Sequence, residues 1–127
     1  MGARERNVTG VLVVEDDNEL RTLFSLFLES EGFTVYQADD GQVALDVLAA
    51  HPGGIQMVIT DLGLPSIGGV DLIKKVRAVD ARLRIIGTSG YGAKNVREMV
   101  LAAGADEFFP KPFSVSDVID KVIALAR

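Results

Sequence analysis

The stretch VLVVEDDNEL, Val11 to Leu20, runs four aliphatic residues directly into three acids. The aliphatic run has the length and the β-branched character of a buried strand, so the acids stand where that strand ends. Adjacent carboxylates repel one another, and either a fully hydrated loop or a bound cation must relieve that repulsion. Which of the two applies depends on what the rest of the chain brings to the same end of the strand.

The composition is that of one globular domain: 127 residues, 48% of them hydrophobic and 24% charged. No apolar run reaches the roughly 18–20 residues of a transmembrane helix, and the opening MGARERNVTG lacks the apolar core of a secretory signal. We therefore expect no membrane contact and a cytoplasmic location. The absence of cysteine excludes disulfides and thiolate metal sites. A net charge of −5 without a basic cluster argues against nucleic acid binding by this chain itself, and favours a protein partner or a cation.

Strand-like and helix-like patterns alternate along the chain. Short β-branched or aromatic runs of strand length occupy residues 11–14, 34–38, 57–60, 84–89 and 107–109. Apolar residues with helical spacing follow each run; after the first they are Leu20, Leu23, Phe24, Phe27 and Leu28. Gly32 and Gly104 stand where helix C-caps are expected, and Ser114 where an N-cap is expected.

Five strands alternating with five helices predict a single doubly wound α/β domain, with a parallel five-stranded sheet covered on both faces. The crossovers between its strands should be right-handed. We expect residues 1–9 to form a loose N-terminal tail and residues 10–127 to form the domain. In an open parallel sheet, functional residues collect at the carboxyl ends of the strands.

The predicted strand exits carry acids, hydroxyls and one lysine. The residues at these exits are Glu15, Asp16 and Asp17, then Asp61, then Thr88, Ser89 and Gly90, and finally Lys111 and Pro112. Because the strands are parallel, all of these residues should face the same edge of the sheet.

Glu15, Asp16 and Asp61 form an oxygen-only ligand set without His or Cys. Such ligands suit a hard cation, and Mg²⁺ is the usual choice where phosphate is handled. Lys111 can pair with a carboxylate at rest and with a phosphoryl oxygen later, and a Ser or Thr hydroxyl offers a further donor. A carboxylate nucleophile with these neighbours has the groups it needs to accept a phosphoryl group.

Four motifs carry a family resemblance: VLVVEDDNELR, MVITDLGLP, IIGTSGYG and GADEFFPKPFS. In this order and spacing they resemble the receiver domain of two-component response regulators, over about residues 10–127. The resemblance implies a flavodoxin-like (βα)5 fold with strand order 2-1-3-4-5. It also implies a phosphorylation-controlled signalling switch, a signalling domain that is not an enzyme acting on a separate substrate.

The resemblance implies a role for each acid of the cluster. Asp61 matches the phosphoacceptor, which takes its phosphoryl group from a sensor histidine kinase or a histidine phosphotransfer protein. Glu15 and Asp16 match the acidic pair, with Asp16 the direct Mg²⁺ ligand and Glu15 acting mostly through water. The backbone carbonyl of Gly63 matches the third protein ligand of the ion. Lys111 matches the family lysine, and Lys111–Pro112 its cis peptide.

The resemblance also implies a switch. Ser89 lies 22 positions before Lys111 and matches the switch hydroxyl, whereas Thr88 should point the other way. Phe108 matches the aromatic switch position, and without a hydroxyl it should act by packing, gaining burial behind Ser89. The implied signalling face consists of the fourth helix, the fifth strand and the fifth helix, where an output domain or a second copy could bind.

Several positions depart from the family pattern without removing a required group. Glu15 replaces the more frequent Asp, and Gly63 leaves no side chain two positions after Asp61. Gly68–Gly69 loses a helix cap, and Pro110 requires an edge strand because it cannot donate a ladder hydrogen bond. Asp17 is expected to be a solvated residue or a helix cap.

Other residues have simpler explanations than a functional one. Asp39-Asp40-Gly41 should form a turn and helix cap, and His51 an exposed loop residue. Tyr91 is either a surface aromatic residue or a lid over the site. Phe108 and Phe109 should point to opposite faces.

Three alternatives deserve comparison. An aspartate-nucleophile phosphatase needs a second acid at the position of Gly63. A nucleotide- or flavin-binding module needs amide donors after the first strand, where three acids would repel phosphate. A pseudo-receiver would keep the fold as an interaction module without phosphorylation. No output domain is expected within these residues, so the chain is either a stand-alone receiver or cut from a longer regulator or hybrid kinase.

Overall fold

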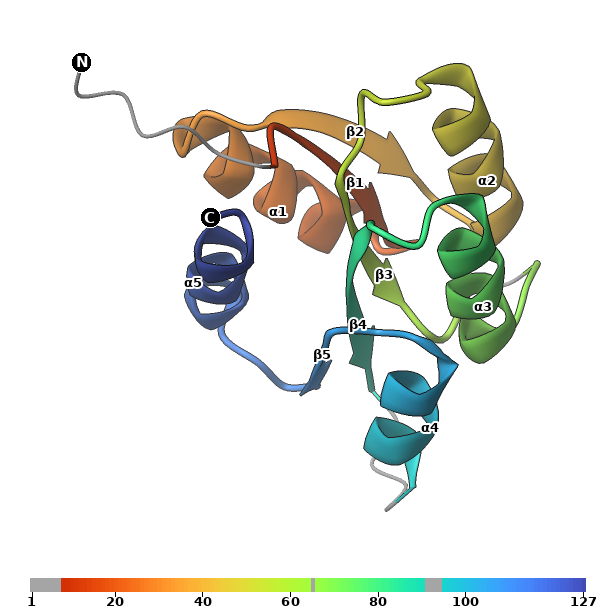
Figure 1. Ribbon diagram of the computed structural model, residues 1–127. Coiled ribbons are helices and arrows are strands. Elements are labelled where there is room, and N and C mark those ends of the chain that lie inside the picture. Colours follow the sequence, from red (N-terminus) through yellow and green to blue (C-terminus); the bar gives the residue numbers. More distant parts are fainter. Residues whose placement is uncertain (1–7, 65, 91–94) are drawn as a thin grey trace.

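A computed structural model describes residues 8–64, 66–90 and 95–127. In these ranges five strands and five helices alternate: β1 (Gly10–Val14), α1 (Asn18–Ser30), β2 (Thr34–Ala38), α2 (Gly41–Ala50), β3 (Met57–Asp61), α3 (Gly69–Val79), β4 (Arg84–Ser89), α4 (Val96–Ala103), β5 (Glu107–Pro110) and α5 (Val115–Leu125). The strands form one parallel sheet in the order β2-β1-β3-β4-β5 (Figure 1). The predicted fold class and strand order are confirmed. Among the described helices, none has the length and apolar character needed to cross a bilayer.

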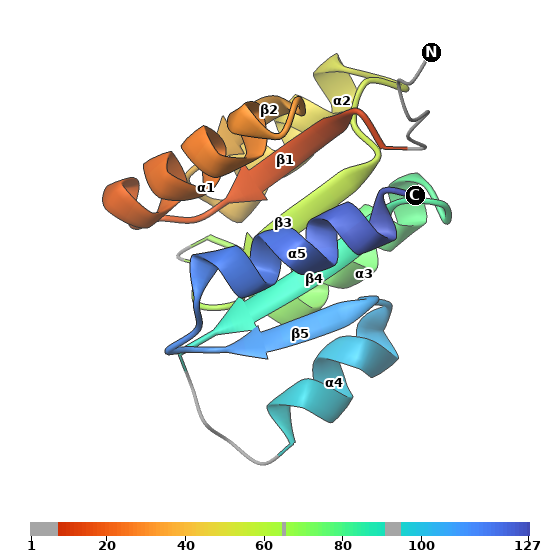
Figure 2. The ribbon, with the colours of Figure 1, turned by 90° about the vertical axis from the view of Figure 1, so that its left-hand side faces the viewer.

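Helices cover both faces of the sheet because buried side chains alternate along each strand. In β1, Val11 and Val13 pack with α1 and α5, whereas Leu12 and Val14 pack with α2 and α3. Figure 2 shows α1 and α5 together in front of the sheet, with the arrowheads of β1, β4 and β5 pointing the same way, because all neighbouring strands are parallel. The two apolar clusters therefore hold the sheet between two helical layers and leave its carboxyl edge for polar residues.

Side chains fix the starts of two helices as the sequence predicts. Asp17 is the N-cap of α1 and accepts hydrogen bonds from the backbone N–H groups of Glu19 and Leu20, at 3.0 and 3.2 Å. Asp40 is the N-cap of α2 and accepts from Val43 N at 2.9 Å. At α3 the cap is Gly68, which makes no side-chain bond, so the expected loss of a cap is confirmed.

The predicted N-terminal tail is described only at its last two residues. Val8 is buried, with 2% of its surface exposed, and its N–H donates to the Ala126 carbonyl at 3.4 Å. The Thr9 N–H donates to Gln56 Oε1 at 2.8 Å. Both residues are thus hydrogen-bonded to the domain, although Thr9 is exposed, while residues 1–7 lie outside the described residues.

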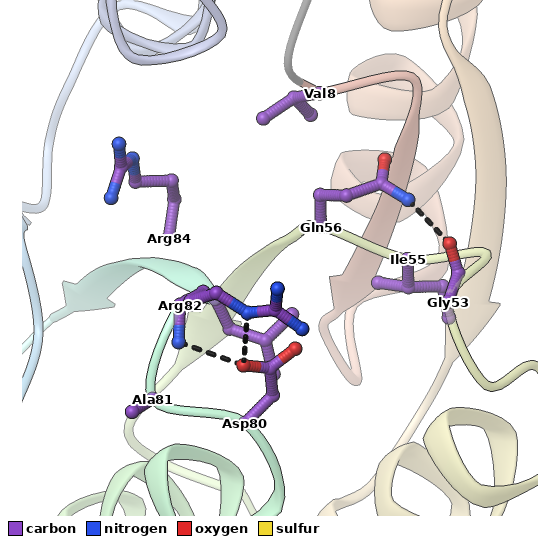
Figure 3. Close-up of a pocket in the computed structure, with 9 residues that line it drawn as sticks. Val8, Gly53, Ile55, Gln56, Asp80, Ala81, Arg82 and Arg84 are labelled. Atoms are coloured by element: carbon purple, nitrogen blue, oxygen red, sulfur yellow. Dashed lines mark hydrogen bonds and ion pairs between the residues drawn. The ribbon is translucent and has the colours of Figure 1, made fainter.

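A cavity of about 600 Å³ opens at the amino ends of β3 and β4. Figure 3 shows Val8, Gln56 and Arg84 around it, together with Arg82, which is paired with Asp80. Because functional residues of a parallel sheet collect at the opposite, carboxyl edge, this cavity lies away from the predicted site.

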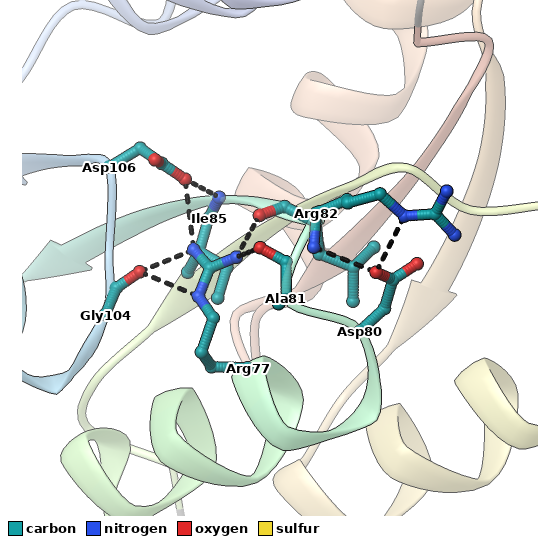
Figure 4. A network of polar contacts seen from close by, with 8 residues as sticks. Arg77, Asp80, Ala81, Arg82, Ile85, Gly104 and Asp106 are labelled. Atoms are coloured by element: carbon teal, nitrogen blue, oxygen red, sulfur yellow. Dashed lines mark hydrogen bonds and ion pairs between the residues drawn. The ribbon is translucent and has the colours of Figure 1, made fainter.

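Arg77 joins three segments near the same end of the molecule (Figure 4). Its guanidinium makes five hydrogen bonds, as many as it has N–H groups. The acceptors are the carbonyls of Ala81, Leu83 and Gly104, the last of which accepts two, and the Asp106 carboxylate, which also accepts from Ile85 N. The side chain is only 25% exposed. Arg77 thereby fixes the C-terminal end of α4 to α3 and to the start of β4.

Replacing Arg77 with Met should destabilise the fold, because several partly buried acceptors lose a charged donor. We expect the free energy of unfolding to fall by about 2 kcal/mol, measured by urea denaturation. Arg82→Met is the matched control, because the Arg82 side chain is 91% exposed and should leave the denaturation midpoint almost unchanged. Equal losses in the two variants would contradict this account of Arg77.

Candidate functional site

Three carboxylates meet at the carboxyl edge of the sheet. Glu15 and Asp16 directly follow β1, and Asp61 is the last residue of the neighbouring strand β3. One oxygen from each carboxylate lies within 4.8 Å of the other two. The structure thus brings together the acids that the sequence placed at two separate strand exits.

Burial makes the negative charges of this cluster costly to keep together. Glu15 is 2% exposed and Asp61 is 6% exposed, while Asp16 is on the surface. Burial raises the pKa of the Glu15 carboxyl above its usual value, and the nearby Asp61 charge and a hydrogen bond with the Asp16 side chain act in the same direction. The Asp17 N–H, 3.1 Å from Glu15 Oε2, and Lys111 oppose that rise. The cluster therefore gains stability from any positive charge brought close to it.

Lys111 supplies one such charge. Its Nζ atom lies 3.4 Å from Glu15 Oε1 and 3.6 Å from Asp61 Oδ1. The residue follows the edge strand β5, and its backbone N–H donates to the Ser89 carbonyl at 2.6 Å. The Lys111–Pro112 peptide is cis, as the resemblance implied. Three carboxylates against one ammonium leave two negative charges, which matches the charge and the oxygen preference of a divalent cation.

Ser89 connects this edge to the α3–α4 side of the sheet. Thr88, the preceding residue of β4, is the register partner of Asp61. Because side chains alternate along a strand, Ser89 and Thr88 belong to opposite faces. Ser89 lines a cavity of about 160 Å³ with residues of the β3–α3 segment and of α4, among them Leu62, Val96 and Met99.

The comparison with known families agrees with this geometry. The family model described as the response regulator receiver domain matches residues 11–123. This chain belongs to the response regulator receiver domain family. It is therefore a receiver domain of the two-component type, a signalling domain, as the four motifs indicated.

The chain is similar in sequence to transcriptional regulators and in structure to solved receiver domains. The transcriptional regulatory protein CpxR of Escherichia coli K12 is 34% identical over 117 residues, which are 92% of this chain and 49% of CpxR. The chain spans about half the length of the curated relatives it matches. A CheY-like receiver from Methanospirillum hungatei has a TM-score of 0.84 at 25% identity, covering 92% of each chain. CheY of Borrelia burgdorferi, in a complex with CheX, BeF3 and Mg²⁺, has a TM-score of 0.84 at 26% identity, covering 91% of this chain and 87% of that one.

The two phenylalanines of β5 point to opposite faces of the receiver domain, as predicted. Phe108 belongs to the apolar cluster on the α3–α4 side, and Phe109 packs against the cluster on the α1–α5 side. Phe108 is only 5% exposed. The expectation that Phe108 would gain burial on switching is therefore wrong, because its side chain is already in the core.

The remaining predicted residues occupy the places expected of them where they are described. Gly63 lies exposed in the loop after β3, and its carbonyl stays a predicted metal ligand. His51 is an exposed residue after α2, with its ring 4.4 Å from that of Tyr36. Tyr91 lies outside the described residues.

Sequence reasoning missed an ion-pair network on the face made by α4, β5 and α5. Glu107 at the start of β5 lies 3.2 Å from Arg97 of α4 and 3.4 Å from Lys121 of α5. Its carboxylate also accepts from the Phe108 N–H at 3.0 Å. That hydrogen bond, with help from Lys121 and Arg97, holds the pKa of the Glu107 carboxyl below its usual value. One carboxylate thus links the three elements of this face.

The lowered pKa of Glu107 predicts a pH-dependent contribution to stability. A carboxyl whose pKa is lower in the folded state stabilises the fold above its unfolded pKa, and this contribution is lost as pH falls through the folded pKa. Glu107→Gln should therefore be less stable than wild type at pH 7, and the difference should shrink as pH falls below about 4. Urea midpoints across this range measure it. A difference that stays constant with pH would show that the ionised carboxylate is not the stabilising form.

Proposed function

We propose that this receiver domain accepts a phosphoryl group on Asp61 from the phosphohistidine of a sensor kinase or phosphotransfer protein. The observation that carries the proposal is the placement of Lys111 Nζ between the buried carboxylates of Asp61 and Glu15. A buried carboxylate at a strand exit with a cation beside it is placed to act as a nucleophile. The domain then works as a phosphorylation-controlled switch.

In the transfer, an Asp61 carboxylate oxygen forms the bond to phosphorus while the phosphorus–nitrogen bond of the donor histidine breaks. The electron pair of that bond stays on the imidazole nitrogen, and Asp61 becomes an acyl phosphate. Lys111 can donate to a phosphoryl oxygen, and the Ser89 hydroxyl can donate to another after it turns toward Asp61. These groups orient the phosphoryl group and offset the charge that develops on its oxygens.

Glu15, Asp16 and Asp61 fit a Mg²⁺ ion, together with the predicted Gly63 carbonyl. The fit rests on the charge left over by Lys111 and on the all-oxygen donor set. When bound, Mg²⁺ neutralises charge on the transferring phosphoryl group. The similarity to Borrelia CheY, which was solved with BeF3 and Mg²⁺, supports this part of the proposal. Asp16 is the exposed member of the cluster, and that supports its role as the direct ligand.

The output of the switch is proposed to pass through the α4–β5–α5 face. The acyl phosphate carries roughly −1.5 to −2 charge, in place of the single negative charge of the Asp61 carboxylate, and its three oxygens draw Ser89 and Lys111 toward it. The two residues are linked by the backbone bond between the Ser89 carbonyl and the Lys111 N–H. The cavity beside Ser89 gives α4 room to follow. An output domain or a second receiver domain would bind the rearranged face.

A pseudo-receiver, which keeps the fold without phosphorylation, has less support. A domain that only binds partners gains nothing from two buried carboxylates that repel each other next to an exposed third. Removing them would stabilise such a domain. Their retention with Lys111 in contact favours the phosphorylated switch.

Asp61→Asn should abolish phosphorylation, because the amide cannot act as the nucleophile. The measurement is the intact mass after incubation with acetyl phosphate and Mg²⁺. Wild type should gain the mass of one phosphoryl group. A smaller fraction of the protein should be phosphorylated when the Mg²⁺ is chelated. Asp17→Asn is the matched control, because Asn is as good a helix cap as Asp, and it should be labelled like wild type. Labelling that survives in Asp61→Asn would refute the assignment.

A further inference from the structure

We propose that Arg21 is a positioning residue for the acid loop, defined as residues 15–18. In this role its guanidinium holds the loop in the arrangement that a divalent cation requires. The proposal rests on the proposed Mg²⁺ site and adds to it a residue that would touch neither the ion nor the phosphoryl group.

The guanidinium of Arg21 contacts both ends of the acid loop and the neighbouring strand β2. Nη1 donates to the backbone carbonyl of Glu15 at 2.8 Å, at the exit of β1. Nε donates to the side-chain oxygen of Gln37 on β2 at 3.1 Å. Nη2 donates to the side-chain oxygen of Asn18, the first residue of α1, at 2.5 Å. The acceptors are all uncharged oxygens, so these bonds hold the loop in place and are not salt bridges.

The bond to the Glu15 carbonyl has a direct consequence for Asp16. The carbonyl of Glu15 and the N–H of Asp16 belong to one planar peptide unit. Fixing the carbonyl therefore fixes the orientation of the peptide plane that precedes the Cα atom of Asp16. On either side of this peptide, the Glu15 N–H donates to the Ala38 carbonyl at 3.0 Å and Asp17 caps α1. Arg21 supplies the restraint between these two fixed points, where the exposed ligand Asp16 lies.

The charge of Arg21 would act in the opposite direction from its geometry. A positive group near the acid cluster repels an incoming cation, so its removal should strengthen Mg²⁺ binding if charge alone mattered. If positioning is what matters, removal of Arg21 should weaken Mg²⁺ binding, because the ligands would no longer be held in the required arrangement. Partners that orient metal ligands are typically worth tenfold or more in affinity. The sign of the change therefore distinguishes the two effects.

The test is a Mg²⁺ titration of the full chain without a phosphoryl donor, with amide NMR shifts as the readout. Arg21→Met and Arg21→Lys should both raise the Kd for Mg²⁺, by roughly tenfold for Met. Lys keeps the charge but cannot reach three acceptors at once. Arg82→Met, at the opposite end of the sheet, should keep the wild-type Kd. Tighter or unchanged binding in Arg21→Met would overturn the proposal.

A kinetic measurement separates positioning from general damage to the fold. With acetyl phosphate, Arg21→Met should need more Mg²⁺ for half-maximal phosphorylation, yet reach a rate within roughly twofold of wild type at saturation. A rate that stays low at saturating Mg²⁺ would overturn the positioning role. If Arg21→Met fails to fold, Gln37→Leu combined with Asn18→Ala removes two of its three anchors and should weaken the Kd in the same direction. Wild type that binds no Mg²⁺ would overturn the metal site itself, whereas a binding wild type with unaltered variants overturns only the role of Arg21.

Discussion

Repulsion among the carboxylates of Glu15, Asp16 and Asp61 is the constraint around which this receiver domain is organised. Two of the three are buried, where like charges interact more strongly than in water. Lys111 offsets one charge through contacts of 3.4 and 3.6 Å. The remaining charge makes the site receptive to a divalent cation. The same charges allow an added phosphoryl group to have large effects on its surroundings.

The fold brings these charges together by its topology alone. All strands of a parallel sheet end at one edge, so residues that are distant in sequence meet there. The opposite end is held firmly, because Arg77 fixes the C-terminal end of α4 to α3 and β4. Near the site, α4 borders the cavity that Ser89 lines. A helix fixed at one end and adjoining open space at the other is suited to move in response to Asp61.

Sequence reasoning was most successful where side-chain pattern determines structure. The ranges of β2 and β4 match the predicted runs, and Asp17 and Asp40 cap helices as expected. The hydrogen bonds of Arg77 and Arg21 were not predicted, because most of their acceptors are backbone carbonyls or amides, which any residue can present or which carry no charge signal. Alternation along the strand assigns Phe108 to one face of the sheet. How deeply its side chain is buried depends on packing across the sheet, which alternation does not predict.

The central claim is that charge at Asp61 is transmitted to the α4–β5–α5 face. The most direct measurement compares amide NMR spectra of the Mg²⁺-loaded domain with and without beryllofluoride, a mimic of the phosphoryl group. The account predicts shifts at Ser89 and Gly90, along α4, and from Glu107 to Phe113, with little change on α2. Shifts that cluster instead on α1 and α2, or none beyond the acid loop, would contradict it.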